Sequence, residues 1–444
     1  MSKIKETSLQ YNLHPWSVQK KINPMVVTKA EGIYLWDEDG KRYYDMSAQL
    51  VNMNLGHGNK AIIQAIKDQA DKLPFIAPSY AIDVRSDAAK AIVEAANLGD
   101  GSKVFFTNAG AEANENAIKM AKAYTGKWKV FSMYRSYHGS SAGADALTGE
   151  PRKFSGEPGL PGFVKFDGPY AYRAPKACTF NSEEDITAFY LELLENQIKY
   201  EGVHQIAAIF VETVVGSNGV LIPPKGYLEG IRALCDKYDI VMVCDEVMTG
   251  WYRIGTTFGF QKFNVKPDLV TFAKGCTCGY VPIGGVIANK KIASHFDENK
   301  MLMGLTYNAH PLGCAAILAT LEEYKRLNIA AHVENMGKIL GEILEDLSKK
   351  HASVGEVRYI GLFSCLEIVK DDSGTPIVPF AEDPHGIMLN ILGMLRTQGF
   401  LTYTHENMIM VAPPLTITEE ELRAAMALLD KVLDSVDHLN ILSQ

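Results

Sequence analysis

Continuous runs of apolar and β-branched residues recur through the middle of the chain, and amphipathic stretches separate them. Strands that read as continuous apolar runs are typical of sheets buried on both faces, and their alternation with helices is typical of parallel sheets. The pattern therefore predicts an α/β domain with a largely parallel sheet over residues 62–325. Its strands are expected at 103–108, 127–134, 206–212, 240–247 and 268–273, with "GGVIANKKIA" following the last of them.

The beginning of the chain carries a different pattern. The stretch "GIYLWDEDGKRYYDM" (32–46) predicts two strands joined at Asp39 and Gly40, a dipeptide that favours hairpin turns. We expect residues 1–61 to form an N-terminal arm and strands that pack on the C-terminal domain.

The C-terminal part mixes helices and strands. A pair of helices is expected at 309–350, and Thr418 with Glu421 forms a capping box that opens a final helix. We expect a smaller α+β domain over residues 326–444.

Composition and charge exclude several classes of protein. The 444 residues carry a net charge of −8 without a basic run, so we expect no nucleic-acid partner. The opening "MSKIKETSLQ" lacks the apolar core of a signal sequence, and no uncharged apolar stretch reaches the roughly 18 residues of a membrane span. Seven scattered cysteines, an odd number, indicate reduced thiols. We therefore expect a cytoplasmic protein with no membrane association.

Two of the cysteines are close in sequence. Cys276 and Cys278 form a single C-x-C pair, with no second pair and no nearby histidine. Zinc sites need more ligands than this pair offers. We interpret both as small packing residues and expect no metal site.

Two charged side chains follow strands that are otherwise apolar. Lys274 comes directly after "DLVTFA", and Asp245 comes directly after "IVMVC". Burying an unpaired charge is costly, so each needs a partner or a function. A lysine at such a place can have a lowered pKa and act as a Schiff-base nucleophile. The carboxylate taken alone is better explained as a helix cap or a structural ion pair.

Two neutral features end other strands of the same predicted sheet, at the edge where open parallel sheets bind ligands. Gly110, after "KVFFTNA", opens a helix whose first N–H groups suit a phosphate, although such turns are common without a ligand. Tyr137, after "VFSMYRS", offers a ring that is usually core but can also stack on a flat cofactor. Pyridoxal phosphate requires all four features: a lysine, an acid for its pyridine nitrogen, a phosphate cup and a ring against its face.

Five ordered motifs make residues 14–430 resemble a known family. They are "TNAGAEANENAIKMAKAYTG", "SYHGSSAGADALTGEPRK", "VCDEVMTGWYRIG", "PDLVTFAKGCTCGYVPIGGV" and "TYNAHPLGCAAILATL". In this order they are similar to the class III aminotransferases, the ω-amino acid branch of the fold type I pyridoxal phosphate enzymes. The resemblance implies a large domain with a mostly parallel seven-stranded sheet, a smaller α+β domain, and pyridoxal 5′-phosphate as cofactor.

The matching motifs imply a role for each of five residues. Lys274 resembles the lysine that carries the cofactor as an aldimine and returns the proton between Cα and C4′. Asp245 resembles the acid that keeps the pyridine nitrogen protonated. Tyr137 would stack on one face of the ring, and Val247 would press on the other. Glu212 occupies the place of the glutamate of a Glu-Pro pair near the substrate.

The resemblance also concerns the phosphate and the subunit arrangement. Gly110 and Ala111 would hold the phosphate through backbone N–H groups. Thr306, in "LTYNAHP", resembles the threonine that reaches the phosphate of the neighbouring subunit. The resemblance therefore implies at least a homodimer with shared active sites, and association of two dimers into a tetramer stays open.

The sequence departs from the family pattern at four positions near the expected site. Ala109 stands where many members have serine, Thr213 where they have proline, and Met248 where they have the glutamine of "DEVQTG". Met410, in "NMIMVAPPL", stands where members that bind an α-carboxylate often have arginine. An anionic substrate therefore needs another cation.

Two residues outside the cofactor motifs are candidates for binding that anion. Arg152, in "TGEPRK", follows the Tyr-His-Gly segment closely enough to face the site, and Trp16, in "LHPWS", lies in an arm that folds over the entrance in relatives. An arginine beside an aromatic ring suits a carboxylate or sulfonate head. The plainer alternatives are a solvated loop arginine and a packed arm residue, and Arg173 and Arg253 are competing cations.

The combined interpretation is an aminotransferase with a ping-pong reaction. "TGEPRK" and the Trp16 arm most resemble the taurine and β-alanine branch, in which the amine passes to pyruvate or 2-oxoglutarate. Donors such as 4-aminobutyrate or a diamine stay open, as does an aminomutase, because aminomutases also carry "DEVMTG". A protein that kept the fold without catalysis would tend to lose Lys274 or Asp245, and both are present.

Overall fold

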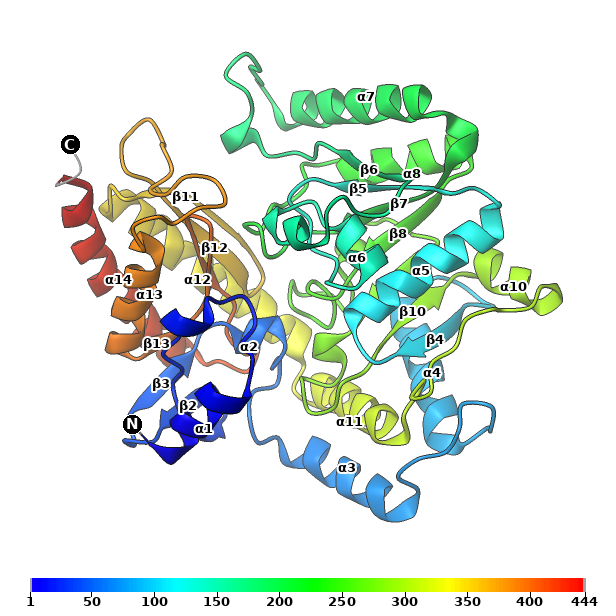
Figure 1. Cartoon of the computed structure of the whole chain (residues 1–444), viewed down its shortest axis with the longest axis horizontal. Helices are drawn as coiled ribbons and strands as arrows, with labels where there is room; N and C mark the ends of the chain where they lie inside the picture. The colour runs from blue at the N-terminus through cyan, green and yellow to red at the C-terminus, as the bar shows by residue number, and fades with distance from the viewer. Residues whose placement is uncertain (1, 442–444) are drawn as a thin grey trace.

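The computed structural model describes residues 2–441 (Figure 1). Within these residues, a seven-stranded sheet forms the centre of the larger part of the molecule. Its strands, in spatial order, are β4 (Lys103–Thr107), β10 (Gly284–Ala288), β9 (Leu269–Phe272), β8 (Val241–Asp245), β7 (Ile206–Glu212), β5 (Lys129–Met133) and β6 (Phe163–Phe166). Strand β10 runs antiparallel to both its neighbours, and the other strands run in one direction. The predicted α/β class with a mostly parallel sheet is confirmed.

Helices cover both faces of this sheet, because alternate residues of a strand point to opposite sides. Ala208 and Phe210 of β7 belong to one cluster of buried side chains, whereas Ile209 and Val211 belong to another. The first cluster includes residues of α5 (Gly110–Thr125), α6 (Ala142–Leu147) and α10 (Lys290–Glu298). The second includes residues of α4 (Asp83–Ala96), α7 (Glu183–Glu201), α8 (Tyr227–Tyr238) and α11 (Pro311–Arg326).

The C-terminal part contains a second, antiparallel sheet. Its strand order is β11 (Val354–Ile360), β12 (Phe363–Ile368), β15 (Met408–Val411) and β14 (Thr404–His405). Its helices are α12 (Ile329–Lys350), α13 (Ile387–Gln398) and α14 (Glu419–Ile441). Helix α12 packs on β11, and α14 packs on α12 and α13.

The N-terminal strands form a third sheet with a strand from the C-terminal part. The strands are β1 (Val27–Glu31), β2 (Tyr34–Asp37), β3 (Arg42–Asp45) and β13 (Phe400–Leu401). Strand β13 pairs with β3 in parallel, and the predicted turn between β2 and β3 contains Gly40 with φ 80°. The three domain boundaries given above stay predictions.

The remaining helices are mostly short. They are α1 (Lys3–Tyr11), η1 (Gln19–Lys21), α2 (Ala48–Val51), α3 (Lys60–Lys72), η2 (Pro151–Gly156), η3 (Ala171–Arg173), η4 (Val203–Gln205), α9 (Gly259–Lys262) and η5 (Lys274–Cys276). The predicted capping box is confirmed, because Glu421 N donates to Thr418 Oγ1 and Thr418 N donates to Glu421 Oε2. Among residues 2–441, no helix has both the length and the apolar character that crossing a bilayer requires.

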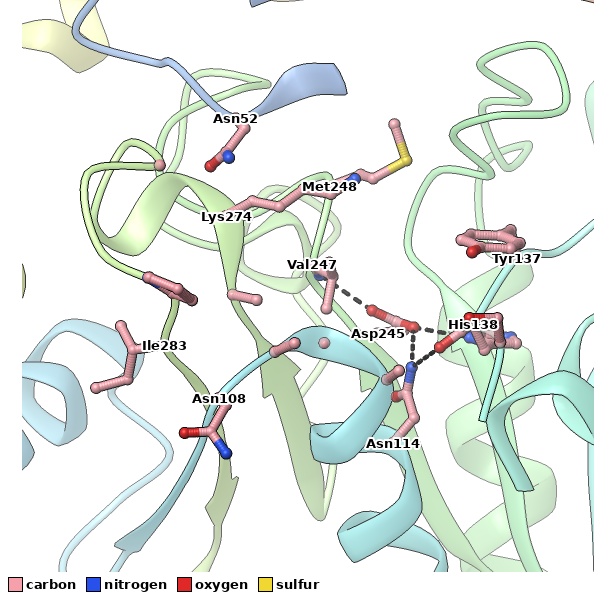
Figure 2. A pocket seen from close by; sticks show the side chains of 18 of the residues that line it. Asn52, Asn108, Asn114, Tyr137, His138, Asp245, Val247, Met248, Lys274 and Ile283 are labelled. Carbon is pink, nitrogen blue, oxygen red and sulfur yellow. Dashed lines mark hydrogen bonds and ion pairs between the residues drawn. The ribbon is translucent and has the colours of Figure 1, made fainter. Parts of the chain in front are cut away.

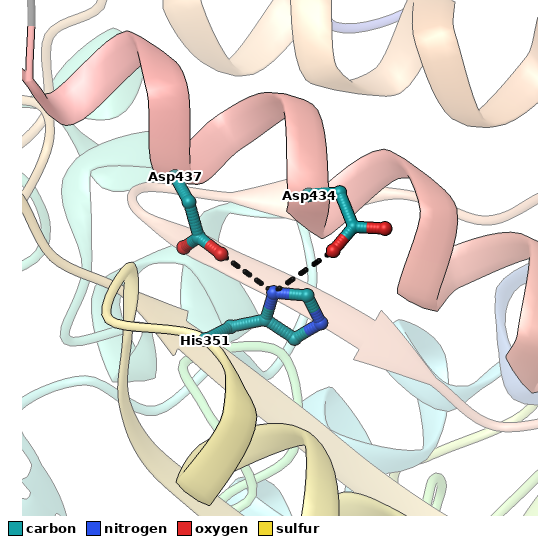
Figure 3. A group of neighbouring side chains, drawn as sticks. All are labelled: His351, Asp434 and Asp437. Atoms are coloured by element: carbon teal, nitrogen blue, oxygen red, sulfur yellow. Dashed lines mark hydrogen bonds and ion pairs between the residues drawn. The ribbon is translucent and has the colours of Figure 1, made fainter.

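A buried histidine joins the end of α12 to the last helix. His351 Nδ1 lies 2.6 Å from Asp437 Oδ2, and His351 Nε2 lies 2.7 Å from Asp430 Oδ1. Figure 3 shows the ring facing Asp437 and Asp434 of α14. Both ring nitrogens thus lie at hydrogen-bonding distance from a carboxylate. We therefore explain this acidic group as an ion-pair cluster and not as a metal site.

Replacing His351 by glutamine is expected to lower the free energy of unfolding by about 1–3 kcal/mol, because two partly buried carboxylates lose a donor. Burial would raise the pKa of Asp430 and Asp437, but hydrogen bonds, including those from His351, outweigh it and lower both pKa values. This stabilisation is present above the ordinary aspartate pKa of about 4 and is lost as the pH falls further.

Thermal unfolding of the wild type and His351→Gln at neutral and acid pH tests this expectation. The matched control is His438→Gln, since His438 is an exposed histidine of the same helix. A difference in melting temperature that stayed constant down to pH values below the carboxyl pKa would contradict it.

Candidate active site

Three neighbouring strands place polar residues side by side at their carboxyl ends in the large sheet. In the parallel pairing of β7, β8 and β9, Glu212 lies opposite Asp245, and Asp245 lies opposite Thr271. At this edge the structure has a cavity of about 430 Å³, a size suited to a small ligand. Of the predicted site residues, Gly110, Ala111, Tyr137, Glu212, Asp245, Val247 and Lys274 line it (Figure 2).

Asp245 is the last residue of β8, and three donors fix its carboxylate (Figure 2). Its Oδ2 accepts a hydrogen bond from Asn114 Nδ2 at 2.8 Å and lies 2.7 Å from His138 Nδ1. Its Oδ1 accepts from Val247 N at 3.0 Å. These bonds orient a buried negative charge toward the cavity, where it can accept a further hydrogen bond from a protonated ring nitrogen.

Lys274 lies just beyond the end of a strand and not within it. Strand β9 stops at Phe272, and Lys274 opens η5 with a left-handed φ of 49°. A non-glycine residue in this conformation carries strain, which is common at functional sites. Burial lowers the pKa of Lys274 to about 8, although Asp245 and Glu212 act in the opposite direction. The amine is therefore available as a nucleophile and as a proton carrier.

Glu212 connects the end of β7 to the segment that carries Tyr137. Its Oε1 accepts from Tyr137 N and its Oε2 accepts from Gly216 N, both at 2.8 Å. Burial raises the pKa of Glu212 to about 7, against the opposing effect of His138. Glu212 thus holds the backbone of the residue whose ring lines the cavity.

The start of α5 forms the other end of the cavity. Ala109 precedes this 16-residue helix, and alanine offers no side-chain acceptor for the first N–H groups. A Cβ added at Gly110 would lie 2.8 Å from a methyl carbon of Val247, so glycine is needed for this close approach. The uncapped N–H groups and the helix dipole form a site for an anion such as phosphate.

Three predicted residues lie outside the lining of the cavity. Thr306 is exposed on this chain, and Trp16 is 65% exposed. Arg152 lies against Tyr137, with its guanidinium carbon 3.7 Å from the ring centroid of Tyr137 and 6.0 Å from that of Trp16. Arg152 Nη2 is buried, and the described residues offer it no hydrogen-bond partner. One nitrogen of this cation thus keeps its hydrogen-bonding capacity beside the site.

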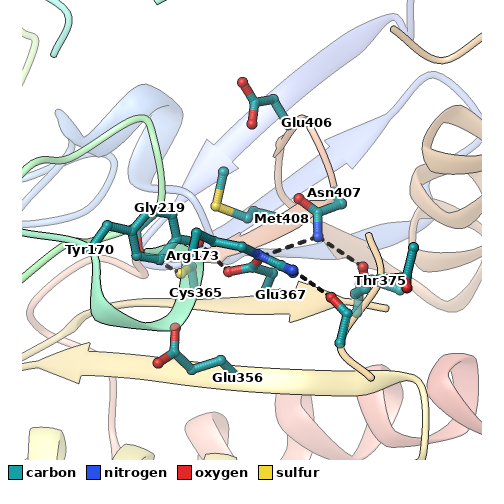
Figure 4. Close-up of polar contacts among 12 residues, drawn as sticks. Tyr170, Arg173, Gly219, Glu356, Cys365, Glu367, Thr375, Glu406, Asn407 and Met408 are labelled. Atoms are coloured by element: carbon teal, nitrogen blue, oxygen red, sulfur yellow. Dashed lines mark hydrogen bonds and ion pairs between the residues drawn. The ribbon is translucent and has the colours of Figure 1, made fainter. Parts of the chain in front are cut away.

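The two competing arginines have acceptors of their own. Arg253 is fully buried, and its Nη1 donates to the carbonyl oxygens of Leu362 and Pro413. Arg173 Nε donates to Glu367 Oε1 at 2.6 Å, and Tyr170 contacts the same carboxylate (Figure 4). Neither of these two arginines lines the cavity, whereas Arg152 stacks on Tyr137, which does, so Arg152 is the better candidate for a substrate anion.

At two of the positions that depart from the family pattern, Thr213 and Met410, the neighbouring side chains suit the residue that is present. Thr213 Oγ1 donates to the buried carboxylate of Glu246 at 3.1 Å, a bond that proline could not make. Met410 is fully buried in an apolar cluster with Phe363 and Cys365. An arginine side chain at this position would have to bury its charge among these residues. Met248 lines the cavity.

Some residues of the site were not singled out by the sequence. Asn114 lies four residues after Gly110, a helical spacing that could have indicated a shared face, and His138 stands beside Tyr137. No sequence signal pointed to Asn52, which lines the cavity from the N-terminal segment. It follows residues 48–51, four non-glycine residues with φ values between 44° and 68°. Such a left-handed turn stores strain next to the cavity.

Comparison with known proteins decides the family. A family model for aminotransferase class-III matches residues 16–433. The chain belongs to the class III aminotransferases. The aminotransferase is similar to a solved taurine:2-oxoglutarate aminotransferase from Bifidobacterium kashiwanohense, in complex with PLP and glutamate, at 46% identity and a TM-score of 0.95 over 98% of both chains.

Other relatives of the aminotransferase are also named as transaminases. An (S)-enantioselective omega-transaminase from Thermomicrobium roseum shares 33% identity and a TM-score of 0.91 over 98% of both chains. A probable gamma-aminobutyrate transaminase 4 from Oryza sativa subsp. japonica is 33% identical over 93% of this chain and 88% of the relative. The relatives agree on transamination, and the two whose names give a donor, taurine and gamma-aminobutyrate, differ in that donor.

Class III aminotransferases use pyridoxal 5′-phosphate, and it is the cofactor of this aminotransferase. The donor set in the cavity fits this group. The uncapped start of α5 suits the phosphate, Asp245 suits the pyridine nitrogen, and the amine of Lys274, which lines the cavity, suits the aldehyde. The fold agrees with fold type I of the pyridoxal phosphate enzymes.

Proposed function

We propose that the aminotransferase takes the amine of a small ω-amino acid with an anionic head, such as taurine or β-alanine. In a ping-pong reaction the amine then passes to a keto acid, 2-oxoglutarate or pyruvate. The observation that carries this proposal is the buried, unpartnered Nη2 of Arg152, on a guanidinium stacked against Tyr137 within the described chain. The similarity to a taurine:2-oxoglutarate aminotransferase supports the same substrate class.

The roles of the cavity residues follow from their positions. When bound, pyridoxal phosphate supplies an electron sink for negative charge on the reacting carbon. Asp245 would accept a hydrogen bond from the pyridine nitrogen and keep it protonated. Lys274 Nζ would remove and return the substrate proton. Tyr137 and Val247 would cover the two faces of the ring, and Glu212 would hold Tyr137 in place.

We further propose a homodimer with shared active sites. Gly110 and Ala111 would bind the phosphate from their own chain. The exposed Thr306 would reach the phosphate of the neighbouring subunit, as the resemblance implies. A cytoplasmic location is proposed with it, because all seven cysteines of the sequence are free thiols, and six of them are buried.

Half-reactions of single amines with the purified holoenzyme test the donor. Each amine is added without an acceptor, and absorbance follows conversion of the bound cofactor to its pyridoxamine form. We expect taurine and β-alanine to react faster than putrescine or alanine. Arg152→Met is expected to slow the taurine half-reaction by about 10–100-fold, the loss of one charge-assisted contact.

The matched control is Lys153→Met, a cation of the same η2 segment that pairs with the exposed Glu157. Its taurine rate should stay near that of the wild type. Conversion by putrescine but not by the acids would refute the proposed donor class.

A second candidate donor is 4-aminobutyrate, favoured by the 33% identity to a probable gamma-aminobutyrate transaminase. The same set of half-reactions distinguishes it, since 4-aminobutyrate would then react faster than taurine. An aminomutase would turn over without any keto acid, whereas the proposed reaction stops after one half-reaction.

A further inference from the structure

The surroundings of Arg152 include a second buried charge that the proposed reaction does not use. Glu150 is 2% exposed, and its Oε1 accepts a hydrogen bond from Arg152 Nε at 2.5 Å. Its Oε2 is also buried and, within the described chain, has no hydrogen-bond partner. Glu150 therefore binds Nε of the guanidinium, and Nη2 has no hydrogen-bond partner among the described residues.

His405 lies beside the carboxylate of Glu150 without neutralising it. Its Nε2 is 3.4 Å from Glu150 Oε2 and 2.9 Å from Asn218 Oδ1. Burial, together with the charges of Arg152 and Arg135, lowers the pKa of His405 to about 4. The ring is therefore uncharged at neutral pH, and its Nε2 faces Asn218 Oδ1 as an N–H donor.

A second ion pair, between Arg135 and Glu406, lies near the first. Arg135 Nη1 lies 3.6 Å from Glu406 Oε2. Burial raises the pKa of Glu406, Arg135 opposes this effect, and Glu150 and Glu367 add to it. Two arginines thus face two glutamates around an uncharged His405. Before a substrate binds, the Arg152–Glu150 ion pair by itself carries no net charge.

We propose that Glu150 limits the substrate head to a single negative charge. This inference rests on the proposed function, in which Arg152 binds the head. A sulfonate or carboxylate adds one negative charge to a neutral pair. A doubly charged phosphonate, which has the same tetrahedral shape as a sulfonate, adds two beside a buried carboxylate, where like charges repel strongly. The site should accept taurine and discriminate against 2-aminoethylphosphonate.

The test compares these two amines in the half-reaction at pH 8.5, where the phosphonate is doubly charged. The wild type is expected to favour taurine in kcat/KM by about tenfold or more, the size of one like-charge contact. Glu150→Gln removes the charge and keeps an oxygen that accepts from Arg152. Glu150→Gln should raise the ratio of kcat/KM for the phosphonate to kcat/KM for taurine by about tenfold or more. This change should come mainly from a lower KM for the phosphonate.

The matched control is Glu157→Gln, which removes an exposed glutamate bound to Lys153 and should leave the ratio at the wild-type value. A second readout needs no variant. Lowering the pH to 6 adds a proton to the phosphonate, so the preference of the wild type for taurine should shrink. Calorimetry should show the same preference without turnover: ethanesulfonate should bind more tightly than ethylphosphonate.

The outcomes separate this inference from the function on which it rests. If Arg152→Met slows taurine while Glu150→Gln leaves the ratio unchanged, the role of Glu150 is overturned and the anion site stands. If Arg152→Met leaves taurine unaffected, both the anion site and the role of Glu150 are overturned. A wild type that uses both amines equally at pH 8.5 also overturns the role of Glu150.

Discussion

Replacing Lys274 by alanine is expected to abolish transamination and to remove the visible absorbance of the bound cofactor. The amine would attach the cofactor and move the substrate proton, and the loss of proton transfer alone costs about 10²–10⁴-fold in rate. The position of Lys274 supports both tasks, because the residue lines the cavity and burial lowers the pKa of its amine to about 8. Absorbance and steady-state kinetics of Lys274→Ala measure the two effects separately.

Lys165 provides a matched control for this experiment. Burial also lowers the pKa of Lys165 to about 8, but its Nζ donates to Ser132 Oγ and to the carbonyl oxygen of Ala146. Lys165→Met is expected to lower the melting temperature and to keep cofactor absorbance and turnover per folded molecule. Turnover by Lys274→Ala at the rate of Lys165→Met would refute the role of Lys274.

The second large effect is expected at Asp245. Asparagine has the same shape, but it carries no charge to keep the pyridine nitrogen protonated. We expect Asp245→Asn to lower kcat by about a hundredfold or more, as the loss of a preorganised charge does in other active sites. Unlike Lys274→Ala, this variant should still bind the cofactor, because Lys274 and the start of α5 are intact. Cofactor content and kcat are therefore measured on the same preparation.

Asp268 is the matched control for Asp245. It is 5% exposed, precedes β9, and binds Arg232 at 2.8 Å and the N–H group of Met242 at 2.9 Å. Asp268→Asn should lower stability and leave kcat within a few-fold of the wild type. Equal losses of kcat in the two variants would show that Asp245 acts only through the fold.

The strands could be predicted where an apolar run is long and ends abruptly. The strand expected at 206–212 is β7 with the same bounds, because each of its residues is buried. The strand expected at 240–247 is shorter, since Glu246 leaves the sheet and accepts hydrogen bonds from Gly259 N and Phe260 N. Strand β6 was missed because it has only four residues, of which one is Lys165.

The cavity could be predicted because parallel strands deliver their last residues to one edge. This rule placed Asp245, Lys274 and Gly110 together without any knowledge of side-chain contacts. The surroundings of Arg152 could not be predicted in this way. His405 reaches Glu150 from a distant part of the chain, and such a contact leaves no local pattern in either segment.

Glu212, Asp245 and Thr271 are paired in register across three neighbouring strands. This register limits where the chain can gain or lose residues during evolution. Side chains alternate between the two faces of a strand, so one residue inserted into β8 would turn the carboxylate of Asp245 to the opposite face. The same insertion would also break the pairing of β8 with β7 and β9. Changes of length are therefore tolerated in the loops that follow these strands and excluded from the strands themselves. The enzyme can acquire new substrates by remodelling those loops while the positions of its charged groups stay constant.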